Sequence, residues 1–318
     1  MRRFLPLLML LASASLIQAQ QPWPQFRGPT GDGHGKAVNL PDTWSESQNI
    51  AWKAPIAGRG WSSPVIADNV AWMTSATVTP ITEEEKARIR KEKLATNPMV
   101  NQMDIGGPVK MFAVGVDLTS GKIIKTIALF EVEEPDPIHS LNSYASPTPI
   151  LDGNKLYCHF GRFGTACADV ATGNILWKTQ LVIDHSVGPG STPVLHDGVL
   201  IVPCDGCDMQ YVTGLDANTG EQRWRTDRPP LEGSLGDIHK AFGTPLVVTH
   251  NGIPQVISVG AQWFVAYEPA TGREIWRFRY GNGFSNVPRP VVAGNIAYLC
   301  TGLLRRKFPP CASMARET

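Results

Sequence analysis

The sequence lacks several features that mark common classes of protein. Beyond its N-terminus it has no run of about 18 apolar residues, so we expect no membrane-spanning helix in the mature chain. Its formal net charge is only +1, so no field of either sign favours nucleic acid as a partner. It also lacks a Gly-x-Ser-x-Gly motif, a His-Glu-x-x-His motif and a phosphate-binding loop. These absences exclude the best-marked hydrolases, metalloproteases and nucleotide-binding enzymes.

Residues that hold metals or haem are also scarce. Cys204-Asp-Gly-Cys207 is a lone Cys-x-x-Cys pair, and no His-x-x-x-His pair is available to complete a zinc site. No Cys-x-x-Cys-His occurs, so covalently attached haem is excluded. We therefore expect no bound metal.

The N-terminus carries the one long apolar stretch. Arg2 and Arg3 precede an apolar run from Phe4 to Ile17, and Ala19 offers a small residue for cleavage. We expect residues 1–19 to be a signal peptide and the chain to be exported, to the periplasm or the extracellular space. A short N-terminal anchor helix is the alternative. Residues 20–48 then form an N-terminal extension.

A repeated phrase is the main signal after this segment. An acidic residue is followed four positions later by Gly and, in three of four copies, four positions further by Trp. The copies begin at Asp117, Asp169, Asp216 and Glu268, with glycines Gly121, Gly173, Gly220 and Gly272 and tryptophans Trp177, Trp224 and Trp276. The acidic side chain can accept hydrogen bonds from a turn backbone, and Gly supplies the positive φ of that turn. We expect each Trp to dock on the next repeat. Lys125 takes the Trp position in the first copy, so we expect a weaker joint there.

A second phrase keeps step with the first. Ser63-Pro64, Thr148-Pro149, Thr192-Pro193, Thr244-Pro245 and Arg289-Pro290 each open an apolar strand, followed by a turn and another apolar strand. One unit therefore has four antiparallel strands, which is typical of a propeller blade of about 40–50 residues. A parallel solenoid would need shorter repeats. The sequence predicts an all-β fold, a β-propeller of four-stranded antiparallel blades.

Taken together, the Ser/Thr-Pro-Val and Asp-x-x-Thr-Gly-x-x-x-Trp phrases resemble the pyrroloquinoline-quinone-like (PQQ-like) repeat family. That family includes quinone-binding alcohol dehydrogenases and binding-only propellers. The opening Trp23-Pro-Gln-Phe-Arg-Gly is similar to large secreted members in planctomycete-like bacteria. The resemblance implies seven or eight blades.

The blade count falls short of that number. Residues 49–302 supply a lone closing strand around Trp52, four full blades and a partial fifth. Residues 303–318 show no strand alternation, and we expect an irregular tail. We interpret the chain as an incomplete, truncated propeller; a short propeller with a disordered tail is the alternative. Residues 82–103 form an insertion in blade one, with a capping box from Thr82 that predicts a solvated surface helix.

The cysteines allow two interpretations. Counting back from the Gly161–Gly164 turn sets Cys158 opposite Cys167, a spacing that permits a cross-strand disulfide. Two small buried thiols are the alternative. A short bridge between Cys204 and Cys207 is also possible.

Polar residues just before the inner strands should converge at the mouth of the propeller channel. They are Arg59, Trp61, His139, Asn142, Tyr144, His185, Ser191, His239, Lys240, Asn286 and Arg289. This mixture suits an anionic or sugar-like ligand, although each residue alone could be an ordinary loop group.

We therefore expect a non-catalytic scaffold of the cell envelope that binds a protein or a small ligand, with no cofactor. The alternative is a periplasmic PQQ-dependent oxidoreductase that binds the quinone with calcium. Against it, the adjacent cysteine pair of those enzymes is absent, and no Asp base can be assigned by motif. The chain matches the residues of those enzymes only in part, at Cys204, Asp205, Cys207 and Asp208.

Overall fold

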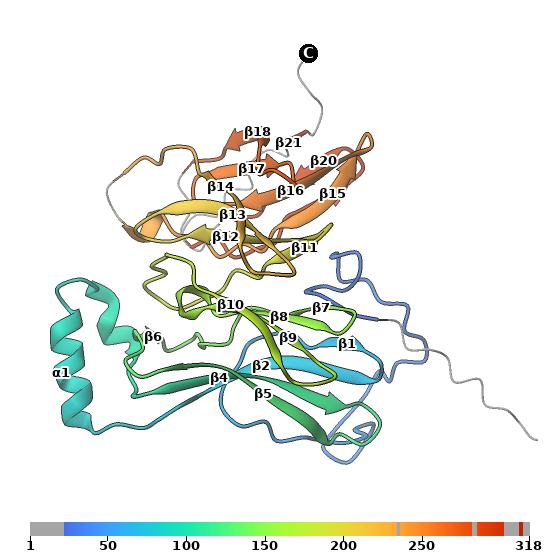
Figure 1. The fold of residues 1–318 in the computed structure, drawn as a ribbon, viewed down its shortest axis with the longest axis vertical. Helices are drawn as coiled ribbons and strands as arrows, with labels where there is room; N and C mark the ends of the chain where they lie inside the picture. The colour runs from blue at the N-terminus through green and yellow to red at the C-terminus, as the bar shows by residue number, and fades with distance from the viewer. Residues whose placement is uncertain (1–21, 234–235, 282–284, 302–311, 314–318) are drawn as a thin grey trace, which may run out of the picture.

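A computed structural model describes residues 22–233, 236–281, 285–301 and 312–313. The predicted signal peptide and most of the predicted tail lie outside these residues. The described chain is nearly all β, and its sheets follow one another in chain order from blade one to the C-terminal sheet (Figure 1). Among the described residues, no helix is long and apolar enough to cross a membrane.

Four sheets have four antiparallel strands each, so the predicted blade is confirmed. Blade one contains β1 (Val65–Ala67), β2 (Val70–Val78), β4 (Val109–Asp117) and β5 (Ile123–Val132). Blade two contains β7 (Ile150–Asp152), β8 (Lys155–His159), β9 (Thr165–Asp169) and β10 (Ile175–Thr179). Blade three contains β11 (Val194–His196), β12 (Val199–Asp205), β13 (Gln210–Asp216) and β14 (Gln222–Asp227). Blade four contains β15 (Leu246–His250), β16 (Ile253–Val259), β17 (Trp263–Tyr267) and β18 (Glu274–Arg279).

A fifth sheet has three strands, β19 (Val291–Ala293), β20 (Ile296–Tyr298) and β21 (Ala312–Ser313). The expectation of a wholly irregular tail is therefore wrong at residues 312–313, which pair with β20. The expected closing strand around Trp52 is also wrong as a strand. Residues 50–58 have no strand assignment, because their backbone makes no ladder with a described strand.

Tryptophans nevertheless join successive blades. At three joints the indole N–H donates to the carbonyl of the residue that follows the acidic residue of the next blade's phrase. The pairs are Trp52 with Leu118 at 2.8 Å, and Trp177 with Ala217 and Trp224 with Pro269, both at 3.0 Å. Trp276 differs, since its Nε1 donates to Gln255 within its own blade, at 2.9 Å.

The phrase itself works as a turn. Asp169 Oδ1, for example, accepts from the backbone N–H of Thr172 at 2.7 Å and from its hydroxyl at 3.0 Å. These bonds hold the pKa of the Asp169 carboxyl below its usual value. Gly220 has φ of +76°, and a Cβ there would lie 2.5 Å from the Trp177 ring. The turn glycine therefore supplies both the backbone conformation and the space for the docking indole.

The Ser/Thr-Pro phrases form a second chain of joints, between the starts of the inner strands. Each hydroxyl accepts from the backbone N–H of the equivalent residue in the preceding blade. The pairs are Ser63 N with Thr148 Oγ1 at 3.0 Å, Thr148 N with Thr192 Oγ1 at 2.9 Å, and Thr192 N with Thr244 Oγ1 at 3.3 Å. The hydroxyls thus align the blades around the axis.

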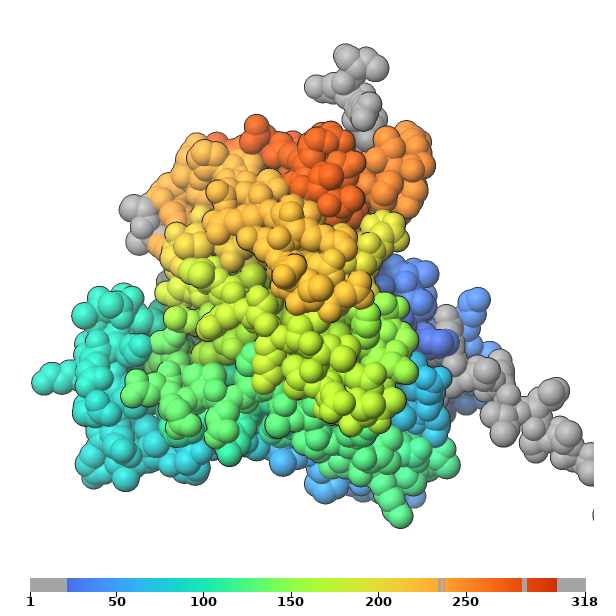
Figure 2. All heavy atoms as spheres, viewed as in Figure 1, coloured from blue at the N-terminus to red at the C-terminus, as the bar shows by residue number. Residues whose placement is uncertain are grey.

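An insertion separates β2 from β4 in blade one. It contains helix α1 (Glu83–Lys93), the 3-10 turn η1 (Pro98–Gln102) and β3 (Met103–Asp104), which pairs with β6 (Ile138–His139). Thr82 forms a capping box with Glu85, and α1 has no buried residue. In Figures 1 and 2 the insertion projects from one side of the stacked blades.

The cross-strand disulfide prediction is wrong. The 3-10 turn η2 (Gly161–Phe163) shifts the hairpin by one residue, so Cys158 faces Ala166 and Tyr157 faces Cys167. A one-residue shift sends two side chains to opposite faces of a sheet. Accordingly Cys158 packs between blades one and two, Cys167 packs toward blade three, and both are free thiols. Cys204 is also a free, buried thiol, so the short bridge is not formed.

Candidate functional site

The loops that lead from each outer strand to the next inner strand pack side by side. Their described residues are 133–149, 180–193, 228–233, 236–245, 280–281 and 285–290. Together with residues 59–64, which lead into β1 and bond the loop before β7, they form a surface that we call the loop face. His139 N donates to Val187 O at 3.1 Å, and Phe242 N donates to Asn286 O at 2.7 Å. The loops of neighbouring blades are therefore in contact, while convergence of all the predicted residues on one channel mouth stays a prediction.

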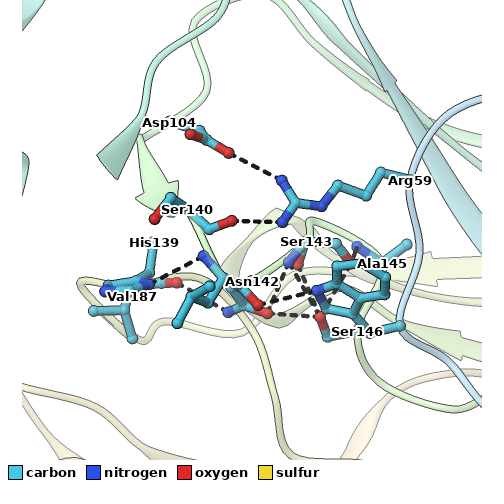
Figure 3. Close-up of polar contacts among 11 residues, drawn as sticks. Arg59, Asp104, His139, Ser140, Asn142, Ser143, Ala145, Ser146 and Val187 are labelled. Atoms are coloured by element: carbon cyan, nitrogen blue, oxygen red, sulfur yellow. Dashed lines mark hydrogen bonds and ion pairs between the residues drawn. The ribbon is translucent and has the colours of Figure 1, made fainter. Parts of the chain in front are cut away.

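Arg59 and Trp61 occupy the part of the loop face at blades one and two. Arg59 donates to Asp104 Oδ2 at 3.0 Å and to Ser140 O at 2.5 Å (Figure 3). Its guanidinium lies 4.9 Å from the centre of the Trp61 ring. Trp61 Nε1 donates to Leu141 O at 3.1 Å. These contacts fix a cation over an indole that remains 56% exposed.

Asn142 and Tyr144 hold the loop beneath this pair. Asn142 Nδ2 donates to Val187 O at 2.9 Å and to Pro189 O at 3.1 Å, while its Oδ1 accepts from Ser146 Oγ at 2.6 Å (Figure 3). Tyr144 is buried and donates to Asp136 O at 2.8 Å. Their polar atoms are used within the protein, so both residues position the loop.

His139 and His239 are also engaged by the backbone. His139 Nδ1 accepts from Leu141 N at 3.1 Å, and His239 Nε2 lies 2.8 Å from Gly233 O. Lys240 is 1% exposed. None of the three presents a charge at the surface of one shared pocket.

His185, Ser191 and Asn286 are three buried polar residues. Each has one polar atom without a described hydrogen-bond partner: His185 Nε2, Ser191 Oγ and Asn286 Oδ1. The His185 ring lies 5.7 Å from the Phe242 ring, and its burial lowers the pKa of its imidazole to about 4. This histidine is therefore neutral near pH 7.

Arg289 serves the N-terminal extension. Its Nη1 donates to Phe26 O at 2.8 Å and to Gly31 O at 3.0 Å, and its Nε donates to Pro245 O at 2.9 Å. Burial lowers the pKa of Arg289 to about 10, so it stays charged. The same extension is also hydrogen-bonded to blade one, because Trp23 forms an isolated antiparallel bridge with Ile66. Arg289 thus fastens a segment across blades one and five.

Sequence reasoning missed a buried ion pair beside the loop face. Arg228 Nη2 lies 2.7 Å from Asp205 Oδ2, and both side chains are 1% exposed. Arg228 also donates to Ser258 Oγ at 2.8 Å in the next blade. The pair is 23 residues apart in the chain, and no local motif links an acid and a base at that distance. No sequence motif identified Leu141 or Asp104 as part of the site either.

A quinone held with calcium would need a set of oxygen ligands for the cation. Within the described residues no three His, Cys, Asp or Glu side chains gather as metal ligands, whereas calcium takes six to eight oxygen ligands, carboxylates prominent among them. Asp205, one of the partly matching residues, is paired with Arg228. Two partly enclosed hollows on the loop face measure about 210 and 160 Å³, and a more open one at Glu232, Arg279 and Tyr280 measures about 360 Å³. Sites for drug-sized ligands usually measure about 300–1,000 Å³.

Comparisons with known proteins agree with the fold. A family model described as outer membrane protein assembly factor BamB matches residues 208–303. No curated protein sequence matches the chain. Among solved structures, a quinohemoprotein alcohol dehydrogenase from Comamonas testosteroni has a TM-score of 0.54 and 14% identity, over 92% of this chain and 49% of that one. BamB from Moraxella catarrhalis has a TM-score of 0.34 and 19% identity, over 62% of this chain and 68% of that one.

The chain therefore spans about half the length of the alcohol dehydrogenase that it matches. At 14% identity, that match bears on the fold alone. The family model covers residues 208–303 alone, and the dehydrogenase match agrees with the repeated four-stranded blades in the propeller fold that the PQQ-like phrases predict.

Proposed function

We propose that the chain is an exported, non-catalytic propeller of the cell envelope that binds a protein partner at the loop face. The observation that carries the proposal is the exposure of Trp61 and Leu141, at 56% and 81%, beside the guanidinium of Arg59. Tryptophan and arginine are the residues most enriched at the energetic centres of protein interfaces. The envelope location rests on the basic and apolar N-terminus.

The geometry favours a binding surface because the exposed groups are held rigidly. The bond from Trp61 Nε1 to Leu141 O and the ion pair between Arg59 and Asp104 restrict both long side chains before any partner arrives. Less conformational entropy is then lost on binding. Arg59 also lines the mostly apolar hollow of about 160 Å³, with Val78 and Ile138. That hollow suits one apolar side chain of a partner.

Panning a phage-displayed peptide library against the purified chain tests the proposal. We expect enriched peptides that carry an apolar anchor, and we expect Trp61→Ala to weaken their binding at least tenfold. Trp44→Ala is the matched control, because Trp44 is a similarly exposed tryptophan, at 66%, in the N-terminal extension. Leu141→Asp is a second variant at a site too exposed to affect folding strongly.

Failure to enrich any peptide, or equal binding to wild type and Trp61→Ala, would overturn this binding site. The non-catalytic assignment has its own test. Absorbance spectra after addition of pyrroloquinoline quinone and Ca²⁺, followed by gel filtration, should show no retained quinone. Retention of a stoichiometric amount of quinone would contradict the assignment as a scaffold and support an oxidoreductase.

A further inference from the structure

A second hollow of about 210 Å³ lies where the insertion meets blades two and three. Lys93 reaches it from the end of α1, Asp136 from the loop before β7, and Arg162 from the turn η2. Asp184 and His185 line it from the loop before β11. Arg59, Trp61 and Leu141 do not line it, and it shares only Ile138 with the hollow beside Arg59.

Two cations share one carboxylate in this hollow. Lys93 Nζ lies 2.7 Å from Asp136 Oδ1, and Arg162 Nη1 lies 2.6 Å from Asp136 Oδ2. An ammonium has three donors and a guanidinium has five, so one carboxylate leaves most of them unused by protein. Lys93 and Arg162 are 43% and 46% exposed. Lys93 and Arg162 therefore keep N–H donors that Asp136 does not use.

The carboxylate that joins the cations is rigidly placed. Asp136 stands between Pro135 and Pro137, whose rings fix φ on both sides. Its carbonyl accepts from Tyr144 Oη at 2.8 Å. Arg162 is anchored through its own carbonyl, which accepts from Gln180 Nε2 at 2.9 Å. The two cations are thus preorganised for a second anion beside Asp136.

Asp184 adds an acceptor at the edge of the same hollow. Its Oδ1 accepts from Ser186 N at 2.8 Å, while a carboxylate offers about four lone-pair sites. The remaining sites suit hydroxyl donors. A ligand with a carboxylate at one end and hydroxyls at the other would satisfy both sides of the hollow.

We propose that this hollow binds a small hydroxylated carboxylate, of the sugar-acid class. The carboxylate of the ligand binds Lys93 and Arg162, where it competes with the Asp136 carboxylate. The hydroxyls of the ligand face Asp184. The volume of about 210 Å³ limits the ligand to a small molecule. The site is independent of the protein-binding surface around Trp61.

Isothermal titration calorimetry of the full chain with sodium D-galacturonate tests the site. Galactose, which lacks the carboxylate, and acetate, which lacks the hydroxyls, are the matched probes. We expect saturable binding of galacturonate, at least tenfold weaker binding of galactose, and weaker binding of acetate. Arg162→Gln should weaken galacturonate binding at least tenfold. Arg88→Gln is the control, because Arg88 is an exposed arginine on α1 paired with Glu92.

Asp136→Asn separates a ligand site from a structural ion triad. Removal of the competing carboxylate should tighten galacturonate binding at least threefold, whereas a purely structural triad would give a lower melting temperature and no tighter binding. Lys93→Gln repeats the test should Arg162→Gln fail to fold. The proposal is overturned by the absence of saturable galacturonate binding, by equal affinity for galactose, or by unchanged affinity in Arg162→Gln. Trp61→Ala should leave the affinity unchanged.

Discussion

Lys125 Nζ donates to Val170 O at 2.9 Å, across the joint between blades one and two. Val170 follows Asp169, so its carbonyl is the same one that accepts an indole N–H at the other joints, as Ala217 does from Trp177. A second bond from Lys125 reaches Ala171 O at 2.5 Å. Lys125 thus makes the hydrogen bond that tryptophan makes at the other joints, but it does not bury an aromatic ring there.

Lys125→Ala should lower the free energy of unfolding by about 1–2 kcal/mol, because it removes the donor from carbonyls at a partly buried joint. Urea unfolding followed by tryptophan fluorescence measures the loss. Lys122→Ala is the control, because Lys122 is an exposed lysine in the turn just before β5, and it should change stability by less than about 0.5 kcal/mol. Equal effects of the two variants would show that the joint does not depend on Lys125.

Gly220→Ala should be strongly destabilising, by about 2–5 kcal/mol, since it adds the cost of positive φ to a clash with the Trp177 ring. Gly198→Ala separates the cost of the positive φ from the cost of the clash. Gly198 has φ of +73°, close to the +76° of Gly220, but a Cβ there would meet nothing within 4 Å. Its cost should be only about 1–2 kcal/mol. Similar losses in both variants would contradict the docking of Trp177 on the turn.

The repeated phrases made the blades predictable because turn chemistry and strand periodicity are local. The register of the Cys158 hairpin was not predictable, because it depends on whether Gly161 to Gly164 form a plain turn or a 3-10 turn. The pairing of Arg228 with Asp205, and the gathering of Lys93, Arg162 and Asp136, depend on how distant loops pack. Such contacts leave no spacing signal in a single sequence.

The candidate site was predictable only in part for the same reason. Position before an inner strand selected residues that bond a neighbouring loop, such as Arg59 with Ser140 and Asn142 with Val187. That position could not distinguish an exposed polar side chain from one that is buried and hydrogen-bonded within the protein. Arg289 shows this, because its partners Phe26 and Gly31 come from a segment more than 250 positions away.

Cys158 and Cys167 should both be alkylated when the chain is unfolded in iodoacetamide without a reductant. Their side chains face opposite sides of blade two, so no bridge can form without a change of register. Burial also raises the pKa of the Cys158 thiol, which keeps it protonated in the folded chain. Peptide mass spectrometry measures the modification. A peptide pair linked through Cys158 and Cys167 would contradict the observed register.

Two buried histidines should make the fold sensitive to mild acid. Burial lowers the pKa of His159 to about 3 and that of His185 to about 4, whereas an unfolded histidine titrates near 6.5. The unfolded chain therefore binds more protons between these values. The free energy of unfolding should be highest above about pH 6.5 and should fall as the pH drops toward 4, by at most about 1.4 kcal/mol per pH unit for each histidine.

Urea unfolding at several pH values between 4.5 and 7 checks this slope, because most carboxylates of the fold titrate below that range. His185→Gln should reduce the slope by up to half, since one of the two proton-binding groups is removed. His34→Gln is the control, because His34 lies exposed in the N-terminal extension. A slope that is unchanged in His185→Gln, or a stability independent of pH over this range, would show that the buried imidazoles are protonated in the folded chain.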